Sequence, residues 1–336
     1  MPKLRIATFN VENLLMRCDF KRLGIDNAER KLNRISDAED ASRLDAMFNV
    51  LSEDDRTLTA QALAATRADV CALQEVENLV TLTAFNNRYL SRWVDRPYQE
   101  RILHEGNDGR GIDVGLLSRA RVIRHRSHAS ETFESLGLKP PKGRSAQARI
   151  FRRDCLEVDV VKDDRVLTLY VCHFKSMHGG RMETREVRRQ EARAVRAIIE
   201  RRFKDPSESE WIILGDLNDY LEIDGEPVED HGLGPLVDDG FSIDLARMLI
   251  EDPYDRWSHH YAHRNTYSAL DHMLLSPALS GLNTGASAAY VRAGVPWRST
   301  RHKGWRLPGI GWSTPKASDH CPFAATIEFT GRALSG

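Results

Sequence analysis

The sequence predicts a single α/β domain, built from many strands and a few helices. Three observations lead to this fold class. Short apolar, β-branched runs recur from one end of the 336 residues to the other, helical segments fall between them, and no repeat or Gly/Ser/Pro linker divides the chain. A chain of this length can bury a substantial core in one domain.

Eight runs have the length and composition of buried strands. In chain order they are LRIATFNV (4–11), DVCALQEV (69–76), GIDVGLLS (111–118), CLEVDVV (155–161), RVLTLYVCHF (165–174), WIILGDLN (211–218), ALDHMLLS (269–276) and CPFAATIEF (321–329).

Helices are expected over 58–68 and 182–203, where apolar residues recur at helical spacing. The second segment carries a stripe of arginines interleaved with Glu186 and Glu191, which is typical of a solvated face. Residues 16–56 are polar and highly charged without clear periodicity. We therefore expect a partly helical surface insertion there, within one domain spanning 1–336.

Composition excludes several classes of protein. A hydrophobic content of 41% and a charged content of 29% are typical of a globular protein, and no apolar run approaches the ~20 residues of a membrane helix. The first residues lack the features of a signal peptide, so we expect a cytoplasmic protein without a membrane anchor. Nothing in the sequence predicts a protein partner.

The cysteines and the charge balance narrow the choice further. The five cysteines are widely spaced and form no CxxC pair, which argues against a disulfide framework or a zinc site. The 48 basic residues nearly balance the 49 acidic ones, so any surface that binds a polyanion must be local.

Polar residues suited to metal binding or acid–base chemistry stand at or just beyond the ends of several predicted strands. Such a pattern gathers side chains at one edge of a sheet. The residues are Asn10, Glu75, His173, Asp216, Asn218, Asp271, Asp319 and His320.

The chemistry of these residues suits phosphodiester hydrolysis, which needs an attacking water and stabilisation of negative charge on the phosphoryl oxygens. Glu75 and Asp319 are hard oxygen ligands that suit Mg²⁺, with Mn²⁺ as the alternative. His320 is the candidate base. Adjacent strand residues point to opposite faces, so Asp319 would face the metal and His320 the water or phosphate. Lys175, on the strand face of His173, is a candidate phosphate ligand.

Four motifs carry a resemblance to a known family. TFNVEN (8–13), LQEVEN (73–78), GDLND (215–219) and SDHCPF (318–323) occur in the order found in the endonuclease/exonuclease/phosphatase superfamily, the deoxyribonuclease I-like metal-dependent phosphoesterases. The resemblance covers nearly the whole chain. It implies a four-layer sandwich, in which two mixed sheets pack face to face and are flanked by helices, with the active site at one edge.

The resemblance also implies roles for individual residues. It pairs His320 with Asp271, and it places Asn10 beside the metal and its carboxylate ligand. His173 is similar to the histidine that donates to a phosphate oxygen, and Asn218 to a residue that hydrogen-bonds the phosphate. Asp216 resembles the carboxylate that orients the nucleophile or assists the leaving group. Whether Asp216 or His320 is the base stays open.

Substrate choice must come from the loops, and one loop is unusual. No acidic residue lies between Asp271 and Asp319, while arginines alternate with aromatic residues there. Such a segment could follow a phosphate backbone and stack bases. Alternatively, its tryptophans pack onto the protein and its arginines pair with acids such as those of residues 224–231. The candidate substrate-binding residues are Arg298, Arg301, Arg306, Trp297 and Trp305.

Three functions follow, in order of preference. The first is a magnesium-dependent nuclease, an endonuclease or exonuclease, whose substrate is DNA ahead of RNA and whose attacking water is activated at a His/Asp dyad. The second is a phosphatase or phosphodiesterase for a phosphorylated lipid, inositol or nucleotide. The third is a non-catalytic binding protein, ranked last because every catalytic position is present. The HFKS stretch (173–176) departs from the abasic-site endonuclease branch and disfavours that specialised activity.

Overall fold

The computed structural model describes residues 1–14 and 53–334. The predicted surface insertion over about 16–56 therefore lies outside the described residues, except for its last residues, which begin a helix. Among the helices of the described part, none is long and apolar enough to cross a membrane.

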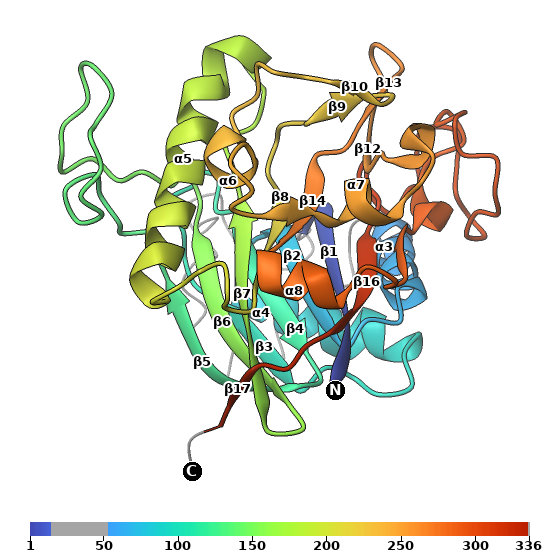
Figure 1. Ribbon diagram of the computed structural model, residues 1–336. Helices are drawn as coiled ribbons and strands as arrows, with labels where there is room; N and C mark the ends of the chain where they lie inside the picture. Colours follow the sequence, from blue (N-terminus) through green and yellow to red (C-terminus); the bar gives the residue numbers. More distant parts are fainter. Residues whose placement is uncertain (15–52, 335–336) are drawn as a thin grey trace, which may run out of the picture.

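Two mixed sheets form the centre of the structure (Figure 1). The six-stranded sheet has the order β15, β16, β1, β2, β4, β3, and the seven-stranded sheet has the order β11, β14, β8, β7, β6, β5, with β17 paired to β7. In chain order the strands of the two sheets are β1 (Lys3–Leu14), β2 (Val70–Val76), β3 (Glu100–Leu103), β4 (Asp113–Ser118), β5 (Arg121–Ser127), β6 (Cys155–Lys162), β7 (Arg165–His173), β8 (Trp211–Asp216), β11 (Ile243–Asp244), β14 (Asp271–Leu275), β15 (Ala288–Tyr290), β16 (Phe323–Glu328) and β17 (Arg332–Ala333).

Helices and two short hairpins complete the described part. The hairpins are β9 (Glu222–Ile223) with β10 (Glu226–Pro227), and β12 (His259–Tyr261) with β13 (Thr266–Ser268). The helices are α3 (Glu53–Ala65), α4 (Leu79–Ala84), η2 (Phe85–Tyr89), η3 (Leu90–Arg92), α5 (Arg181–Arg202), α6 (Gly234–Val237), α7 (Leu245–Leu249), η4 (Pro253–Asp255), α8 (Pro277–Leu282) and η5 (Arg292–Gly294).

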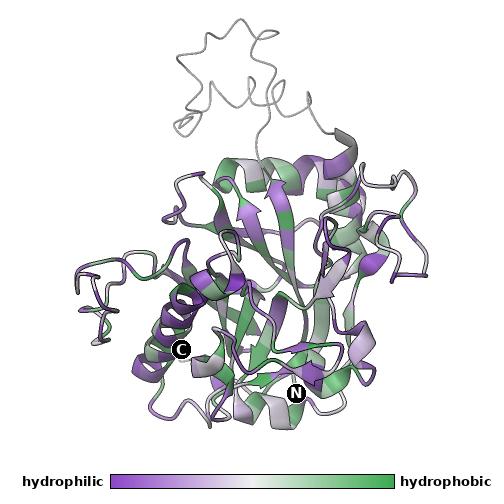
Figure 2. Ribbon diagram, turned by 90° about the horizontal axis from the view of Figure 1, so that it is seen from above, coloured by the Kyte–Doolittle hydropathy of each residue, from purple (hydrophilic) through white to green (hydrophobic). Residues whose placement is uncertain are grey.

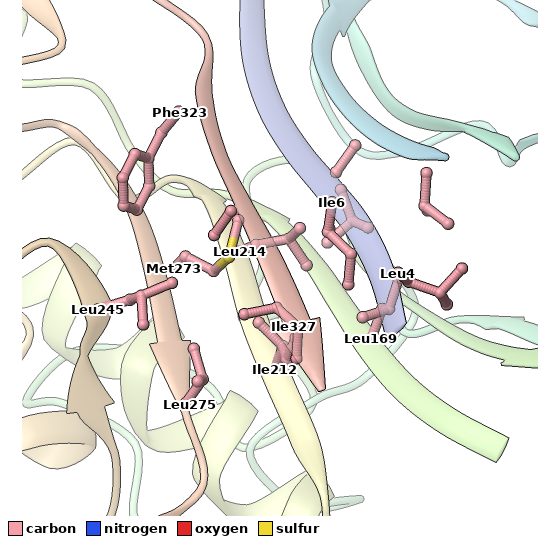
Figure 3. Packing of buried hydrophobic residues seen from close by; sticks show 14 of the residues in the cluster. Leu4, Ile6, Leu169, Ile212, Leu214, Leu245, Met273, Leu275, Phe323 and Ile327 are labelled. Atoms are coloured by element: carbon pink, nitrogen blue, oxygen red, sulfur yellow. The ribbon is translucent and has the colours of Figure 1, made fainter. Parts of the chain in front are cut away.

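The core between the sheets follows from the two-residue period of β1. Leu4 and Ile6 face the second sheet and pack with side chains such as Leu169 and Leu214 (Figure 3). Asn10 continues the same even-numbered face and is also buried. The register that builds the core therefore directs Asn10 toward the second sheet at the carboxyl end of β1, which is the upper end in Figure 1.

Helices cover the outer faces of both sheets. The odd-numbered residues of β1, such as Phe9, pack with α3 and α4, while α5 covers the second sheet through Val195, Ile198 and Ile199. These four layers confirm the predicted sandwich. The outer side of α5 is hydrophilic, as Figure 2 shows.

One expectation for α5 was wrong. Glu191 is fully buried, although the sequence pattern placed it on the solvated face. Its carboxylate accepts the backbone N–H groups of Arg152, at 2.9 Å, and Lys175, at 2.7 Å. Glu191 thus connects α5 to the segments before β6 and after β7, a contact that helical periodicity cannot reveal.

Irregular backbone at the carboxyl ends of the strands shapes the site. The pairing of β1 with β2 shifts register between Asn10 and Leu14, and the pairing of β2 with β4 shifts between Gln74 and Val76. Glu75 lies in the second irregularity with φ of 66°, a left-handed conformation that is uncommon for a side chain of its size. Bulges of this kind re-aim side chains next to active sites.

The glycine of the GDLND motif is required by close strand packing. Gly215 has φ of 143°, and a Cβ atom there would lie 1.9 Å from the carbonyl oxygen of Cys172 on β7. Glycine therefore lets β8 approach β7 next to Asp216.

Candidate active site

Three candidate residues lie in one row across neighbouring strands of the second sheet. His173 on β7 is the register partner of Asp216 on β8, and Asp216 is the register partner of Asp271 on β14. All three are buried at the same end of the sheet. The sheet register alone brings together residues that are widely separated in sequence.

His320 completes a dyad with Asp271, as the family resemblance implied. The Nδ1 atom of His320 lies 2.6 Å from Oδ2 of Asp271. The hydroxyl of Ser258 accepts the backbone N–H of Asp271, and the hydroxyl of Ser318 accepts that of His320, each at 3.0 Å. With Nδ1 hydrogen-bonded to the carboxylate, Nε2 is the ring nitrogen left to face the site.

In two Asp-His dipeptides, 271–272 and 319–320, the aspartate and the histidine do not pair with each other but with residues from elsewhere in the chain. Asp271 pairs with His320, whereas its neighbour His272 turns to Asp244, with Nδ1 of His272 2.7 Å from Oδ2. Asp319 points instead toward His259, with 3.8 Å between Oδ2 and Nε2. Asp271 and His272 thus serve opposite faces of β14, as strand alternation predicts, whereas the side chains of Asp319 and His320 both approach His259, contrary to the expected opposite orientation.

Asp216 lies at the centre of the converging polar groups. Its Oδ2 atom accepts a hydrogen bond from Nδ2 of Asn10 at 2.9 Å. The same oxygen lies 3.5 Å from Nε2 of His173 and 3.9 Å from Nε2 of His320. Its other oxygen accepts the backbone N–H of Asn218 at 2.9 Å, so the carboxylate is held from several sides.

The three central ionisable groups have different perturbed pKa values. Burial raises the pKa of Asp216 to about 7, a shift that the Asp271 carboxylate increases and His320 opposes. Burial disfavours the charged form of His320, but Asp271 and Asp216 outweigh it and raise the pKa of His320 well above its ordinary value. Burial lowers the pKa of His173 well below its ordinary value. At neutral pH, His320 is therefore protonated and His173 neutral, while Asp216 is close to its midpoint.

The first sheet contributes a second group of oxygen donors. Glu75 and Asp319 flank the end of β1, on β2 and ahead of β16 respectively. The Oε2 atom of Glu75 accepts the backbone N–H of Asn13 at 3.0 Å. The backbone N–H of Asp319 donates to Glu12 at 2.9 Å. Glu12 and Asn13, near the end of β1, therefore link the two predicted metal ligands.

These donors fit a hard divalent cation. Glu75 is half-buried, and its Oε1 atom accepts no hydrogen bond within the described residues. The Asp319 side chain is 38% exposed. Partial burial opposes the charge of Asp319, yet His259 and His320 hold the pKa of its carboxyl below the ordinary value, so it is ionised at neutral pH. A carboxylate pair beside an amide oxygen is a donor set that Mg²⁺ or Mn²⁺ accepts.

Several residues with clear structural roles at the site were not predicted. Glu12 accepts from Asp319 and forms an ion pair with Lys316, 2.6 Å from Nζ. Asp219, the last residue of GDLND, forms a buried ion pair with Arg188 at 3.0 Å. Its position in the motif was the only sequence signal for that role. His259 carried no signal, because only the pairing of β12 with residue 320 brings it to the site.

Two predicted phosphate ligands are engaged elsewhere. β7 ends at His173, and the ammonium group of Lys175 donates to the carbonyl oxygens of Ser176, at 2.8 Å, and His178, at 3.2 Å. Arg306 is buried, and its guanidinium donates to the carbonyl oxygens of its own loop, including that of Ser299 at 2.9 Å. Both residues therefore have roles in loop architecture. The burial of Arg306 is contrary to the prediction, whereas the contact of Lys175 with phosphate stays a prediction.

Some of the remaining loop candidates contact the protein itself, and others are free to contact nucleic acid. Arg301 pairs with Asp224 and lies over the ring of Tyr254, as the alternative expected. Trp305 is 68% exposed and Trp297 is 50% exposed, with the guanidinium of Arg306 over the Trp297 ring at 4.4 Å from its centroid, so both rings keep a free surface. Arg298 is half-buried and donates to the carbonyl oxygen of Ala262 at 2.9 Å, which attaches this loop to the β12–β13 hairpin.

A sequence model of the Endonuclease/Exonuclease/phosphatase family matches residues 5–293. None of the curated proteins compared with the chain matches it.

Solved structures share the fold at low identity. D. rerio TDP2 complexed with a single-strand DNA product is 16% identical, with a TM-score of 0.55 over 98% of this chain and 100% of that one. An endonuclease/exonuclease/phosphatase from Bacteroides vulgatus is 16% identical, with a TM-score of 0.54 over 98% and 99%. Truncated Caenorhabditis elegans TDP2 is 14% identical, with a TM-score of 0.51 over 97% of each chain. At these identities the likeness concerns the fold alone.

Proposed function

The chain belongs to the endonuclease/exonuclease/phosphatase family, whose members hydrolyse phosphoester bonds, and we propose that it is a metal-dependent phosphodiesterase acting on DNA. The observation that carries this proposal is the position of Asp216. A carboxyl group with a pKa of about 7 lies between a protonated and a neutral histidine. Groups with pKa values shifted in opposite directions are typical of acid–base catalysis near neutral pH.

We assign the role of general base to Asp216. Its ionised form accepts the proton of the attacking water, and the hydrogen bonds from Asn10 and Asn218 fix its orientation. The sequence left the choice between Asp216 and His320 open. The raised pKa of His320 favours Asp216, because an imidazolium has no free lone pair with which to accept a proton.

The histidines then stabilise the phosphoryl group. The protonated Nε2 of His320 donates to a phosphoryl oxygen, with Asp271 balancing the charge of the imidazolium. Neutral His173 donates a second hydrogen bond from the opposite side of Asp216. Asn218 already donates from Nδ2 to the carbonyl oxygen of Phe174 at 3.1 Å, so its contribution to phosphate binding is through its remaining N–H.

Glu75 and Asp319, assisted by Asn10, are the residues that would hold Mg²⁺, with Mn²⁺ as the alternative. Such an ion supplies neutralisation of phosphoryl charge as a Lewis acid. The hydrogen bond from Asn13 and the bulge at Glu75 hold the first of these carboxylates in position.

Nucleic acid is favoured as the substrate by the loop of residues 296–316, which lies beside β12 and β13 in Figure 1. The loop attaches to the β12–β13 hairpin through Arg298, and the hairpin pairs with His320 at the catalytic centre. The exposed tryptophans lie in the same loop as Arg298 and Lys303, which form no ion pair within the described residues, and this combination suits the bases and phosphates of a single strand. The single-strand DNA product bound by D. rerio TDP2 agrees with this substrate class.

A cavity of about 510 Å³ supports a second candidate function. Its lining includes Tyr254, Tyr267, Lys303 and the ion pair of Arg301 with Asp224, which combine aromatic surface with charges of both signs. A single phosphorylated head group or nucleotide would fit such a cavity, and this favours a phosphatase or phosphodiesterase for a small substrate. Purified protein incubated with plasmid, single-stranded DNA, RNA and a panel of small phosphoesters distinguishes the two functions. Cleavage of DNA supports the first, whereas hydrolysis of small phosphoesters alone supports the second.

Replacing Glu75 by Gln tests the metal site. We expect the apparent affinity for Mg²⁺ to fall by about 10- to 100-fold or more, because even residues behind the metal ligands have effects of that size. The melting temperature should change little, since the half-buried side chain lies at the open end of the sheet. Hydrolysis is measured across a magnesium titration, and Glu77→Gln is the matched control two residues away. Undiminished hydrolysis by wild-type protein in excess chelator would exclude the metal mechanism.

The combined substitution of Arg298 and Lys303 by Glu tests the substrate class. If both cations contact phosphates, the slope of log affinity against log salt for DNA should fall by about 0.7 to 0.9 per contact. Hydrolysis of a small chromogenic phosphodiester should hardly change. Lys162→Glu with Arg165→Glu is the control of equal charge, because these exposed residues flank the opposite end of β7. Equal loss of DNA binding in both double variants would show that only net charge matters.

A further inference from the structure

We propose that His259, Asp319 and His320 form a binding site for a transition-metal ion, and that Zn²⁺ bound there inhibits hydrolysis by occupying His320. The inhibition rests on the proposed function, whereas the binding does not. The site is distinct from the oxygen site at Glu75, although Asp319 belongs to both.

The three side chains already converge. One ligand atom of each lies within 4.8 Å of the others, and Nε2 of His259 is 3.8 Å from Oδ2 of Asp319. Zinc binds imidazole nitrogens and carboxylate oxygens at about 2.0–2.2 Å, so neighbouring donors lie roughly 3 to 4 Å apart. Small side-chain movements would bring all three donors into this range.

The imidazole of His259 makes no hydrogen bond within the described residues. Its Nδ1 atom is buried without a partner, and the 3.8 Å between Nε2 and Asp319 exceeds hydrogen-bond length. The side chain is only 14% exposed, so bulk water compensates little. A buried imidazole normally satisfies at least one ring nitrogen, and a metal ion at Nε2 would do so here.

His320 is held by a carboxylate in the way that zinc-binding histidines usually are. Histidines that bind metals usually donate the other ring N–H to a carboxylate, which fixes the ring and strengthens the metal bond. The contact of Nδ1 with Asp271 at 2.6 Å provides this arrangement and leaves Nε2 as the ligand atom. The features that prepare His320 for a phosphate therefore also prepare it for zinc.

The backbone holds the two histidines together. His259 forms a β-bridge with His320, and their rings lie 4.7 Å apart between centroids. The backbone N–H of Cys321 donates to the carbonyl oxygen of Ser258 at 2.6 Å. The backbone N–H of His260 donates to the backbone carbonyl oxygen of Asp319 at 3.3 Å. Little ordering of the chain is then needed on binding, which favours affinity.

Ligand chemistry determines which ion this site selects. Mg²⁺ prefers oxygen donors and retains water, so two imidazole nitrogens give it little affinity, whereas they suit Zn²⁺. To bind Nε2 of His320, Zn²⁺ must displace the proton held there, which leaves to solvent, and the imidazole could then donate no hydrogen bond to a phosphoryl oxygen. Zinc should therefore inhibit hydrolysis in the presence of Mg²⁺, which competes with it only for Asp319.

Zinc titration of wild-type protein, His259→Gln and His263→Gln tests the proposal. His263 is an exposed histidine in the turn of the same hairpin and serves as the matched control. Isothermal calorimetry in Mg²⁺ should detect one Zn²⁺ per wild-type chain, with affinity lower by on the order of 10- to 100-fold in His259→Gln and unchanged in His263→Gln.

Activity provides the second measurement. The zinc concentration for half-inhibition, taken relative to each variant's own rate in Mg²⁺, should rise by a similar factor in His259→Gln alone. Equal zinc affinity in wild type and His259→Gln would overturn the site. Tight binding that depends on His259 but leaves hydrolysis unchanged would overturn the inhibition, and the binding data stand even if no substrate is hydrolysed.

Discussion

Replacement of Asp216 by Asn is expected to lower kcat by about 10²- to 10⁴-fold, the range for loss of a positioned acid–base group. Asn has nearly the same shape, so the backbone N–H of Asn218 keeps an oxygen acceptor, while the amide has no proton affinity at neutral pH. The loss should appear in kcat and should be as large with a small phosphodiester as with DNA, because the substitution leaves the loop of residues 296–316 unchanged. Circular dichroism and the melting temperature establish that the variant is folded.

The pH dependence of kcat/KM tests whether Asp216 is the base. The base must be ionised, and burial raises the pKa of Asp216 to about 7, so kcat/KM for wild-type enzyme should rise as the pH increases through about 7. The residual activity of Asp216→Asn should lack this acidic limb. If His320 were the base instead, the limb would lie at higher pH, because the pKa of His320 is raised well above its ordinary value.

An Asp216→Asn variant that retained turnover within a few-fold of wild type would contradict the assignment of the base. The pH at the midpoint of the acidic limb of that variant would then give the pKa of the group that acts as base in place of Asp216. Asp205→Asn is a suitable control, since this exposed carboxylate lies in the turn before β8, at the other end of the strand from Asp216.

Sequence alone predicted which polar side chains gather at one edge of the sheets, because they stand at or just beyond the ends of predicted strands. Asn10, His173 and Asp216 were singled out in this way, and they lie together in the structure. The order of the motifs then implied the pairing of His320 with Asp271, which the structure contains. These features are local, or they are inherited from a fold with fixed strand order.

Features that depend on long-range packing could not be predicted. Arg306 was read as a phosphate ligand because its loop lacks acids, but its guanidinium is buried against carbonyl oxygens of that loop. Glu191 was assigned to a solvated face, yet two backbone N–H groups draw it inside. His259 joins the site only through a β-bridge across some 60 residues of sequence. A charge pattern does not show which charges find internal partners.

Removal of His320 or Asp271 is the other substitution with a large expected effect. We expect His320→Ala and Asp271→Asn each to lower kcat by on the order of 10² to 10⁴, because the imidazolium and its carboxylate act as one unit. The double variant should lose little more than the worse single variant, since groups that act together are strongly non-additive. Single-turnover rates on a small phosphodiester measure the chemical step directly.

Asp271→Asn should also move the alkaline limb of the pH profile. Asp271 raises the pKa of His320, so its neutralisation lowers that pKa. A donor that must be protonated then loses its proton at lower pH, and the alkaline limb shifts toward neutral pH. An unshifted limb would mean that another group titrates there.

The pair formed by His272 and Asp244 is an internal control for this dyad. It has a similar contact, 2.7 Å between Nδ1 and Oδ2, and both residues are buried, but Nε2 of His272 faces the carbonyl oxygen of Asp219. His272→Gln should therefore lower the melting temperature while the folded enzyme keeps its pH profile. If His320→Ala behaved in the same way, losing stability but not turnover, His320 would be a structural histidine and the catalytic dyad would be refuted.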